Sequence, residues 1–173
     1  MKNFTKTISY IAICITLIII GSITHIPTTP PITMQLLVIF LICGLFNFKI
    51  AFFSILIYIL LGFIGLPIFS GFKNGASAIL SPTGGFIIGF CFIPIIKLTL
   101  IKIRKTITFN IIYYSLSLII LYIIGFIWLG YFFKDYILAL KFSLTFLPID
   151  IIKALIAIKT VNLLKKLNVF KQN

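Results

Sequence analysis

The last long apolar run of the chain contains an acidic and a basic residue, Asp150 and Lys153, in the order F-L-P-I-D-I-I-K-A-L. A spacing of three residues places both side chains on one face of a helix. Ionisable groups inside a membrane-spanning helix cost about 2.5–3.5 kcal/mol each, so they usually face the bundle interior and mark a site or a pathway. We therefore predict a polar site at Asp150 and Lys153. The alternative is a self-neutralising pair near a helix end, with the lysine reaching toward the surface.

Lys159 differs from this pair, because it falls on the opposite helix face and nearer the inner surface, which it is expected to reach. Thr33 and Gln35 lie in P-I-T-M-Q at the start of another apolar run, where they place polar groups at the outer mouth of a helix. Proline and a hydroxyl residue are also ordinary features of a helix start. The single histidine, His25, has no second ligand nearby, so no metal site is expected.

Three common catalytic motifs are absent from the sequence. Without G-x-x-x-x-G-K-[ST] the chain has no P-loop with which to hydrolyse ATP, and it also lacks H-E-x-x-H and G-x-S-x-G. With two acidic residues and one histidine, it offers few candidates for acid–base chemistry. The sequence predicts no catalytic residues and a protein that is not an enzyme.

The elements that must position the polar residues are long apolar runs. Hydrophobic residues make up 61% of the 173 residues and charged residues 10%, with a mean hydropathy of +1.26. Such runs are typical of a polytopic membrane protein. The sequence predicts an all-α integral membrane protein, with residues 1–173 forming a single domain of six transmembrane helices. The expected spans are Ile8–Ile23, Ile32–Phe46, Ile50–Phe69, Gly84–Ile101, Ile107–Leu129 and Leu147–Leu164.

The net charge of +13 comes from basic residues that cluster between the spans. If both termini are cytoplasmic, the outer segments hold only Lys73, Lys134 and Lys141. This distribution follows the positive-inside rule and favours two cytoplasmic termini. It also explains the basic character without a nucleic-acid partner.

Two segments remain open to more than one interpretation. The stretch Gly62–Phe90 holds seven of the eleven glycines, and we predict that its folded loop shapes a pocket on the outer face. The alternative is a plain connecting loop. The mixed segment 132–146 either lies along the outer surface or extends a neighbouring helix.

Four motifs occur in an order that resembles the BioY family of biotin transporters: P-I-T-M-Q (31–35), Y-x-x-x-G-x-x-G-L-P-I-F (58–69), S-P-T-G-G-F-I-I-G-F (81–90) and P-I-D-I-I-K (148–153). Members of this family are the substrate-binding S components of energy-coupling factor transporters. The resemblance implies a multi-pass protein of the cell membrane that captures biotin from outside. It also implies a transmembrane coupling protein and cytoplasmic ATPases as partners. Biotin is then the ligand, ATP is used by the partners, and the chain has no cofactor of its own.

The resemblance also implies site residues. In the family, the D-x-x-K element and the loop before P-T-G-G help to hold the ligand. By position in the motifs, these correspond here to Asp150, Lys153 and Asn74. The other predicted ligand residues are Thr83, Gly84, Gly85 and Gln35. S components typically carry an A-x-x-x-A contact for the coupling protein on the first helix, and Ala12 and Thr16 have that spacing here. With Ser9 they form a stripe of small residues, which lets membrane helices approach closely. The stripe packs either on the coupling protein or on another helix of this chain.

The chemistry of biotin fits an aspartate and a lysine. An aspartate accepts from a ureido N–H, and a lysine donates to a carbonyl or pairs with a carboxylate. The spacing leaves open which end of biotin each residue holds. Two other functions remain: an S component for another small vitamin, or an intramembrane acyl-transfer or lipid-modifying enzyme. The enzyme requires a nucleophile and a base in one plane, and the sequence offers no persuasive set.

Overall fold

The computed structural model describes residues 2–26, 28, 31–100 and 107–167. Helices make up most of this part of the chain, so the predicted helical character is confirmed, although the structure also contains a short two-stranded ribbon. In chain order the elements are α1 (Lys2–Ile23), β1 (His25–Ile26), β2 (Ile32–Thr33), α2 (Gln35–Leu45), α3 (Phe48–Phe63), the 3-10 turn η1 (Ser70–Phe72), α4 (Gly75–Ile79), α5 (Gly84–Gly89), α6 (Phe92–Thr99), α7 (Ile107–Phe133) and α8 (Tyr136–Lys166).

In the part of the chain that the structure describes, two helices are long and apolar enough to cross a membrane, through the segments Phe4–Ile23 of α1 and Phe109–Phe133 of α7. Helices α2 and α3 are also apolar but shorter, and α2 has only 11 residues. At a rise of about 1.5 Å per residue, α2 is roughly 16 Å long. It is therefore much shorter than the hydrocarbon core of a bilayer, which is about 30 Å thick.

The second and third predicted spans are longer than the helices that form. Residues Ile32–Thr33 pair with His25–Ile26 as a short antiparallel ribbon, so α2 begins only at Gln35. Helix α3 ends at Phe63 instead of Phe69. Just beyond its end, Gly65 takes a φ of +114°, a conformation that favours glycine.

The fourth predicted span is divided. It forms α5 and α6, with Phe90 and Cys91 between them, and its predicted end at Ile101 lies outside the described residues. Lys97 of α6 donates to two carbonyl oxygens at the end of α2, those of Cys43 (2.5 Å) and Phe46 (2.8 Å). A cation at a helix C-terminus satisfies carbonyls that have no partner within the helix. Lys97 thus ties α6 to α2.

The mixed segment 132–146 extends a helix, one of the two predicted possibilities. Helix α8 begins at Tyr136, after Asp135, whose Oδ1 accepts from the backbone N–H groups of Ile137 (2.8 Å) and Leu138 (3.1 Å). This N-cap starts the helix well before the predicted start at Leu147. Pro148 lies inside α8, where it removes one backbone hydrogen bond without ending the helix.

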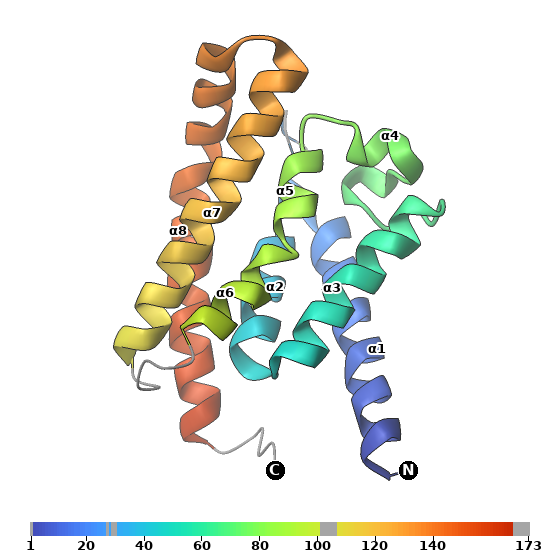
Figure 1. Ribbon diagram of the computed structural model, residues 1–173, viewed down its shortest axis with the longest axis vertical. Coiled ribbons are helices and arrows are strands. Elements are labelled where there is room, and N and C mark those ends of the chain that lie inside the picture. Colours follow the sequence, from blue (N-terminus) through green and yellow to red (C-terminus); the bar gives the residue numbers. More distant parts are fainter. Residues whose placement is uncertain (1, 27, 29–30, 101–106, 168–173) are drawn as a thin grey trace.

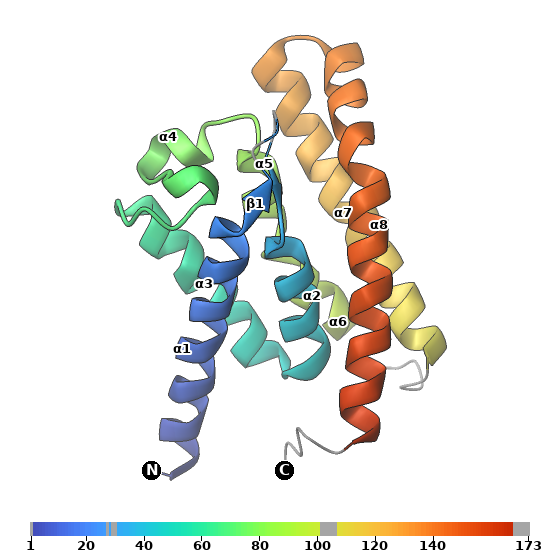
Figure 2. The same ribbon diagram turned by 180° about the vertical axis from the view of Figure 1, so that it is seen from behind.

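Helices α7 and α8 form a long hairpin that stands beside the remaining helices (Figures 1 and 2). Two buried tyrosines of α7 join it to the rest: Tyr114 donates to the carbonyl of Phe40 in α2, and Tyr113 donates to that of Ile93 in α6, each at 3.0 Å. Gly44 of α2 faces α8, and a Cβ there would lie 2.2 Å from the Tyr114 hydroxyl. The close approach of α2 to the hairpin therefore depends on glycine.

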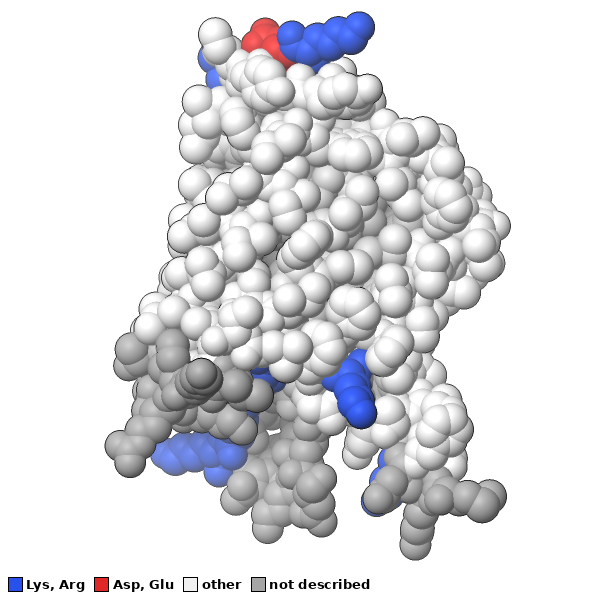
Figure 3. Space-filling model, viewed as in Figure 1, with Lys and Arg blue, Asp and Glu red and all other residues white. Residues whose placement is uncertain are grey.

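The start of α1 and the end of α8 lie at one end of the molecule (Figures 1 and 2). On the face seen in Figure 3, the charged side chains lie at the two ends, and the wide band between them shows none. This distribution is typical of a protein whose middle zone is immersed in hydrocarbon.

Candidate functional site

A cavity opens at the end of the molecule that carries the glycine-rich segment. It encloses about 820 Å³, part of which is open to solvent. Its lining comes from the second strand, four helices and the loop between α3 and α5: Pro31, Ile32, Thr33, Gln35, Leu36, Phe69, Ser70, Lys73, Ala78, Ser81, Thr83, Phe86, Ile87, Phe90, Leu121, Phe142, Phe146, Asp150 and Lys153.

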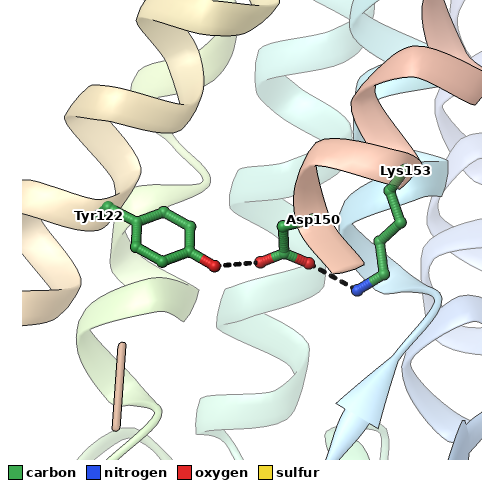
Figure 4. A network of polar contacts seen from close by, with 3 residues as sticks. All are labelled: Tyr122, Asp150 and Lys153. Carbon is green, nitrogen blue, oxygen red and sulfur yellow. Dashed lines mark hydrogen bonds and ion pairs between the residues drawn. The ribbon is translucent and has the colours of Figure 1, made fainter. Parts of the chain in front are cut away.

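A chain of three polar side chains crosses from α7 to α8 at the cavity (Figure 4). Lys153 Nζ lies 2.7 Å from Asp150 Oδ1, and the Tyr122 hydroxyl donates to Asp150 Oδ2 at 2.8 Å. Asp150 and Lys153 are 8% and 7% exposed, so neither charge is fully solvated. Each charge is compensated by the other, and both carboxylate oxygens have a donor. Each oxygen still has a free lone pair for a further donor.

Two other polar atoms of the cavity lining are buried, and the described part of the chain gives neither of them a hydrogen-bond partner. They are Nε2 of Gln35 and Oγ of Ser70. Buried polar groups nearly always have a partner, and an exception calls for an explanation. A polar ligand bound in the cavity would explain both atoms, because it would give each of them a hydrogen-bond partner. In the described residues, no three His, Cys, Asp or Glu side chains gather in a way that could hold a metal ion.

Four of the predicted ligand residues line one cavity. Asp150 and Lys153 lie on one wall, on α8, and Gln35 lies at the start of α2. Thr83 precedes α5, with its Oγ1 3.1 Å from Ser81 Oγ. The structure therefore brings together residues that are more than 100 positions apart in the sequence.

Asn74, Gly84 and Gly85 do not line the cavity. Asn74 is exposed, and its Nδ2 donates to the carbonyl of Gly65 at 3.0 Å. A Cβ on Gly84 would lie 1.5 Å from the carbonyl oxygen of Ile79, and one on Gly85 would lie 2.3 Å from Trp128 Cβ. These three residues therefore support the segments around the cavity and do not form its wall.

The loop between α3 and α5 is fastened to the bundle at both ends. At its start, the Tyr58 hydroxyl lies 3.3 Å from the carbonyl of Ile68, and the rings of Tyr58 and Phe69 meet edge to face at 5.5 Å. At its end, Trp128 Nε1 donates to the carbonyl of Ser81 at 2.9 Å. These contacts place Phe69 and Ser81 in the cavity wall, so the prediction that this stretch shapes a pocket is consistent with the structure.

Sequence analysis missed the two aromatic side chains that α8 adds to the cavity, Phe142 and Phe146. They precede Asp150 by eight and four residues, so on one continuous helix they share its face. This spacing was visible in the sequence, but it places the residues on one helix face only if α8 begins before Leu147. It also missed Tyr122, and no spacing in the sequence connects that residue with Asp150.

The small-residue stripe on α1 lies on the outside of the bundle, where Ser9, Ala12 and Thr16 are all exposed. The two hydroxyls donate to carbonyls one turn earlier: Thr16 Oγ1 to Ala12 and Ser9 Oγ to Thr5, each at 3.0 Å. The stripe therefore presents a smooth helix face whose polar groups are already satisfied. It points away from the other helices of the chain.

Known proteins resemble this chain along most of its length. The model of the BioY family matches residues 1–169. The "Probable biotin transporter BioY" of Pyrococcus horikoshii is 35% identical over 158 residues, which cover 88% of this chain and 92% of the relative. The "Biotin transporter BioY2" of Lactococcus lactis is 40% identical over 130 residues, which cover 73% and 71%.

A crystal structure of the S component for biotin from an ECF-type ABC transporter superposes on this fold with a TM-score of 0.81. The sequence identity is 30%, and the match covers 95% of this chain and 93% of the other. The likeness therefore extends over nearly the whole of both chains.

Proposed function

Because the chain belongs to the BioY family, we propose that it is the biotin-binding membrane subunit of an energy-coupling factor transporter that takes up biotin. The observation that carries the proposal is the buried pair of Asp150 and Lys153 in the wall of a cavity lined by polar and aromatic side chains. Its family makes the chain a transport subunit and sets aside the intramembrane enzyme considered above.

The polar groups of the cavity complement those of biotin. The ureido group has two N–H donors and a carbonyl acceptor, and the thiophane ring and side chain are apolar. Asp150 can accept from a ureido N–H, while Lys153 Nζ and Gln35 Nε2 can donate to the carbonyl. Phe69, Phe86 and other apolar lining residues are available to cover the rings. Equilibrium binding of labelled biotin to the purified chain in detergent tests the proposal, and saturable one-to-one binding is the expected result.

We further propose six spans with both termini in the cytoplasm and the cavity on the outer side. Support comes from the common end at which α1 starts and α8 finishes (Figure 1) and from the lysines at that end. Cysteines replacing Asn74 and Leu167, each in a background without the native cysteines, are expected to react with an impermeant reagent from opposite sides of the membrane. Labelling of both from the same side contradicts this topology.

The chain has no P-loop, so we propose that a transmembrane coupling protein and cytoplasmic ATPases energise uptake. Ala12 and Thr16 are the proposed contact with the coupling protein, because their stripe is exposed on α1 and free of bulky side chains.

Ala12→Leu is expected to abolish or strongly reduce biotin uptake in cells while biotin binding to the purified chain stays unchanged. The added side chain projects from the stripe and keeps a partner helix at a distance, whereas no residue of the stripe lines the cavity. Ala76→Leu is the matched control, since Ala76 is also exposed but lies on α4. Loss of binding in Ala12→Leu would show instead that the stripe supports the chain's own fold.

A further inference from the structure

The turn at the mouth of the cavity contains Ser70 and Lys73, which both line the cavity. Ser70 Oγ is one of the two unpartnered atoms described above, and Lys73 has been given no role so far. We propose that these two residues form a carboxylate-binding subsite for the charged end of the ligand. The uncharged polar end then lies at the opposite side of the cavity, against Asp150 and Lys153. This inference rests on the proposed function and adds the direction in which the ligand is held.

The first support is the distribution of charge. Lys153 is already neutralised by Asp150 at 2.7 Å, so the deep wall of the cavity has no net charge to offer an anion. A carboxylate placed there adds an uncompensated negative charge in a poorly solvated region, which is unfavourable. An uncharged ureido group brings no such cost. The deep wall therefore suits the neutral end of the ligand.

The second support is the state of Lys73. Among the described residues that line the cavity, Lys73 is the only exposed one, so it lies where the cavity opens. Both acidic residues of the chain are engaged elsewhere, because Asp150 binds Lys153 and Tyr122 while Asp135 caps α8. The Lys73 ammonium thus has no side-chain carboxylate of this chain to pair with.

The third support is the Ser70 hydroxyl, which is buried at the cavity and for which the described residues supply no partner. A hydroxyl and an ammonium three residues apart give two donors for the two oxygens of one carboxylate. Hydrogen bonds of this kind are charge-assisted and about twice as strong as neutral ones.

The backbone of the turn is held in an unusual shape. Phe69 N–H donates to the carbonyl of Lys73 at 3.1 Å, and Gly71 and Phe72 both have a positive φ, of 70° and 58°. A positive φ is strained for a bulky residue and persists only where the surroundings impose it. The Phe72 side chain is 61% exposed, so its own packing does not explain the strain. The conformation instead fits a turn that holds Ser70 and Lys73 toward the cavity.

The test compares biotin with biotinamide, in which a neutral amide replaces the carboxylate. Wild-type protein is expected to bind biotin about tenfold more tightly than biotinamide, and Lys73→Met to remove this preference by weakening biotin binding alone. Ser70→Ala is expected to reduce the preference by a smaller factor, about threefold. Lys141→Met, an exposed lysine of α8 outside the cavity lining, is expected to keep it.

The inference is overturned if wild-type protein binds biotin and biotinamide equally, or if Lys73→Met keeps the preference. Loss of the preference in Lys153→Met but not in Lys73→Met shows that the ligand lies the other way round. A wild-type chain that binds no biotin at all contradicts the proposed function itself, so the two failures are distinguishable.

Discussion

Asp150→Asn and Lys153→Met are each expected to weaken biotin binding by at least about tenfold, which corresponds to about 1.4 kcal/mol. Both side chains line the cavity, and both have lost most of their hydration. Removing one of them takes away a ligand contact and leaves the other charge without its partner at 2.7 Å. Breaking a buried pair costs about 3–5 kcal/mol, so part of the loss arises in the protein.

The double variant Asp150→Asn with Lys153→Met separates these two contributions. It removes both charges, so we expect it to recover thermal stability in detergent relative to the single variants but not biotin affinity. Lys159→Met is the matched control, because Lys159 is exposed on the same helix and outside the cavity lining. Wild-type affinity in both single variants would mean that the pair only stabilises the helix bundle.

Gly84→Ala is expected to destabilise the fold by about 3 kcal/mol, the upper end of the usual range for overpacking. The added Cβ would lie 1.5 Å from the carbonyl oxygen of Ile79, an atom of the backbone that moves only if the turn before α5 moves. Thermal unfolding in detergent measures the effect as a lowered midpoint.

Gly89→Ala, in the same helix, is the comparison variant for Gly84→Ala. There the added Cβ would lie 2.7 Å from Leu121 Cδ1, the end of a flexible side chain that can turn aside. A smaller fall in the unfolding midpoint is therefore expected. If Gly84→Ala kept wild-type stability and lost only biotin affinity, Gly84 would be a ligand contact instead of a support for the segments around the cavity.

The helical character of the protein and much of its arrangement along the chain were predictable from the apolar runs. The ends of the helices were harder to predict, because apolar residues occur both in membrane-spanning helices and in loops that pack against the helix bundle. Phe69 illustrates this: it follows α3 in a largely apolar run that contains Gly65 and Pro67, and it turns back to pack on Tyr58. The last span was predicted to start at Leu147, whereas the actual start of α8 depends on the Asp135 side chain as N-cap.

The deep wall of the candidate site was predictable, because an aspartate and a lysine in an apolar helix require an explanation. The rest depends on tertiary structure. The contact between Tyr122 and Asp150 arises from the packing of two helices, which fixes the rotation of each about its axis. Gly84 and Gly85 belong to a motif beside the cavity, and only the packing distances show that they allow close contact with α4 and α7.

The ion pair on α8 also determines how the empty site responds to the membrane potential. One elementary charge that crosses a potential of 100 mV gains or loses about 2.3 kcal/mol. Asp150 and Lys153 carry opposite charges on adjacent turns of the same helix, so they move together and their contributions cancel. A shift of α8 within the bilayer therefore transfers no net charge through this pair. Voltage therefore does not bias the resting position of the helix through this pair.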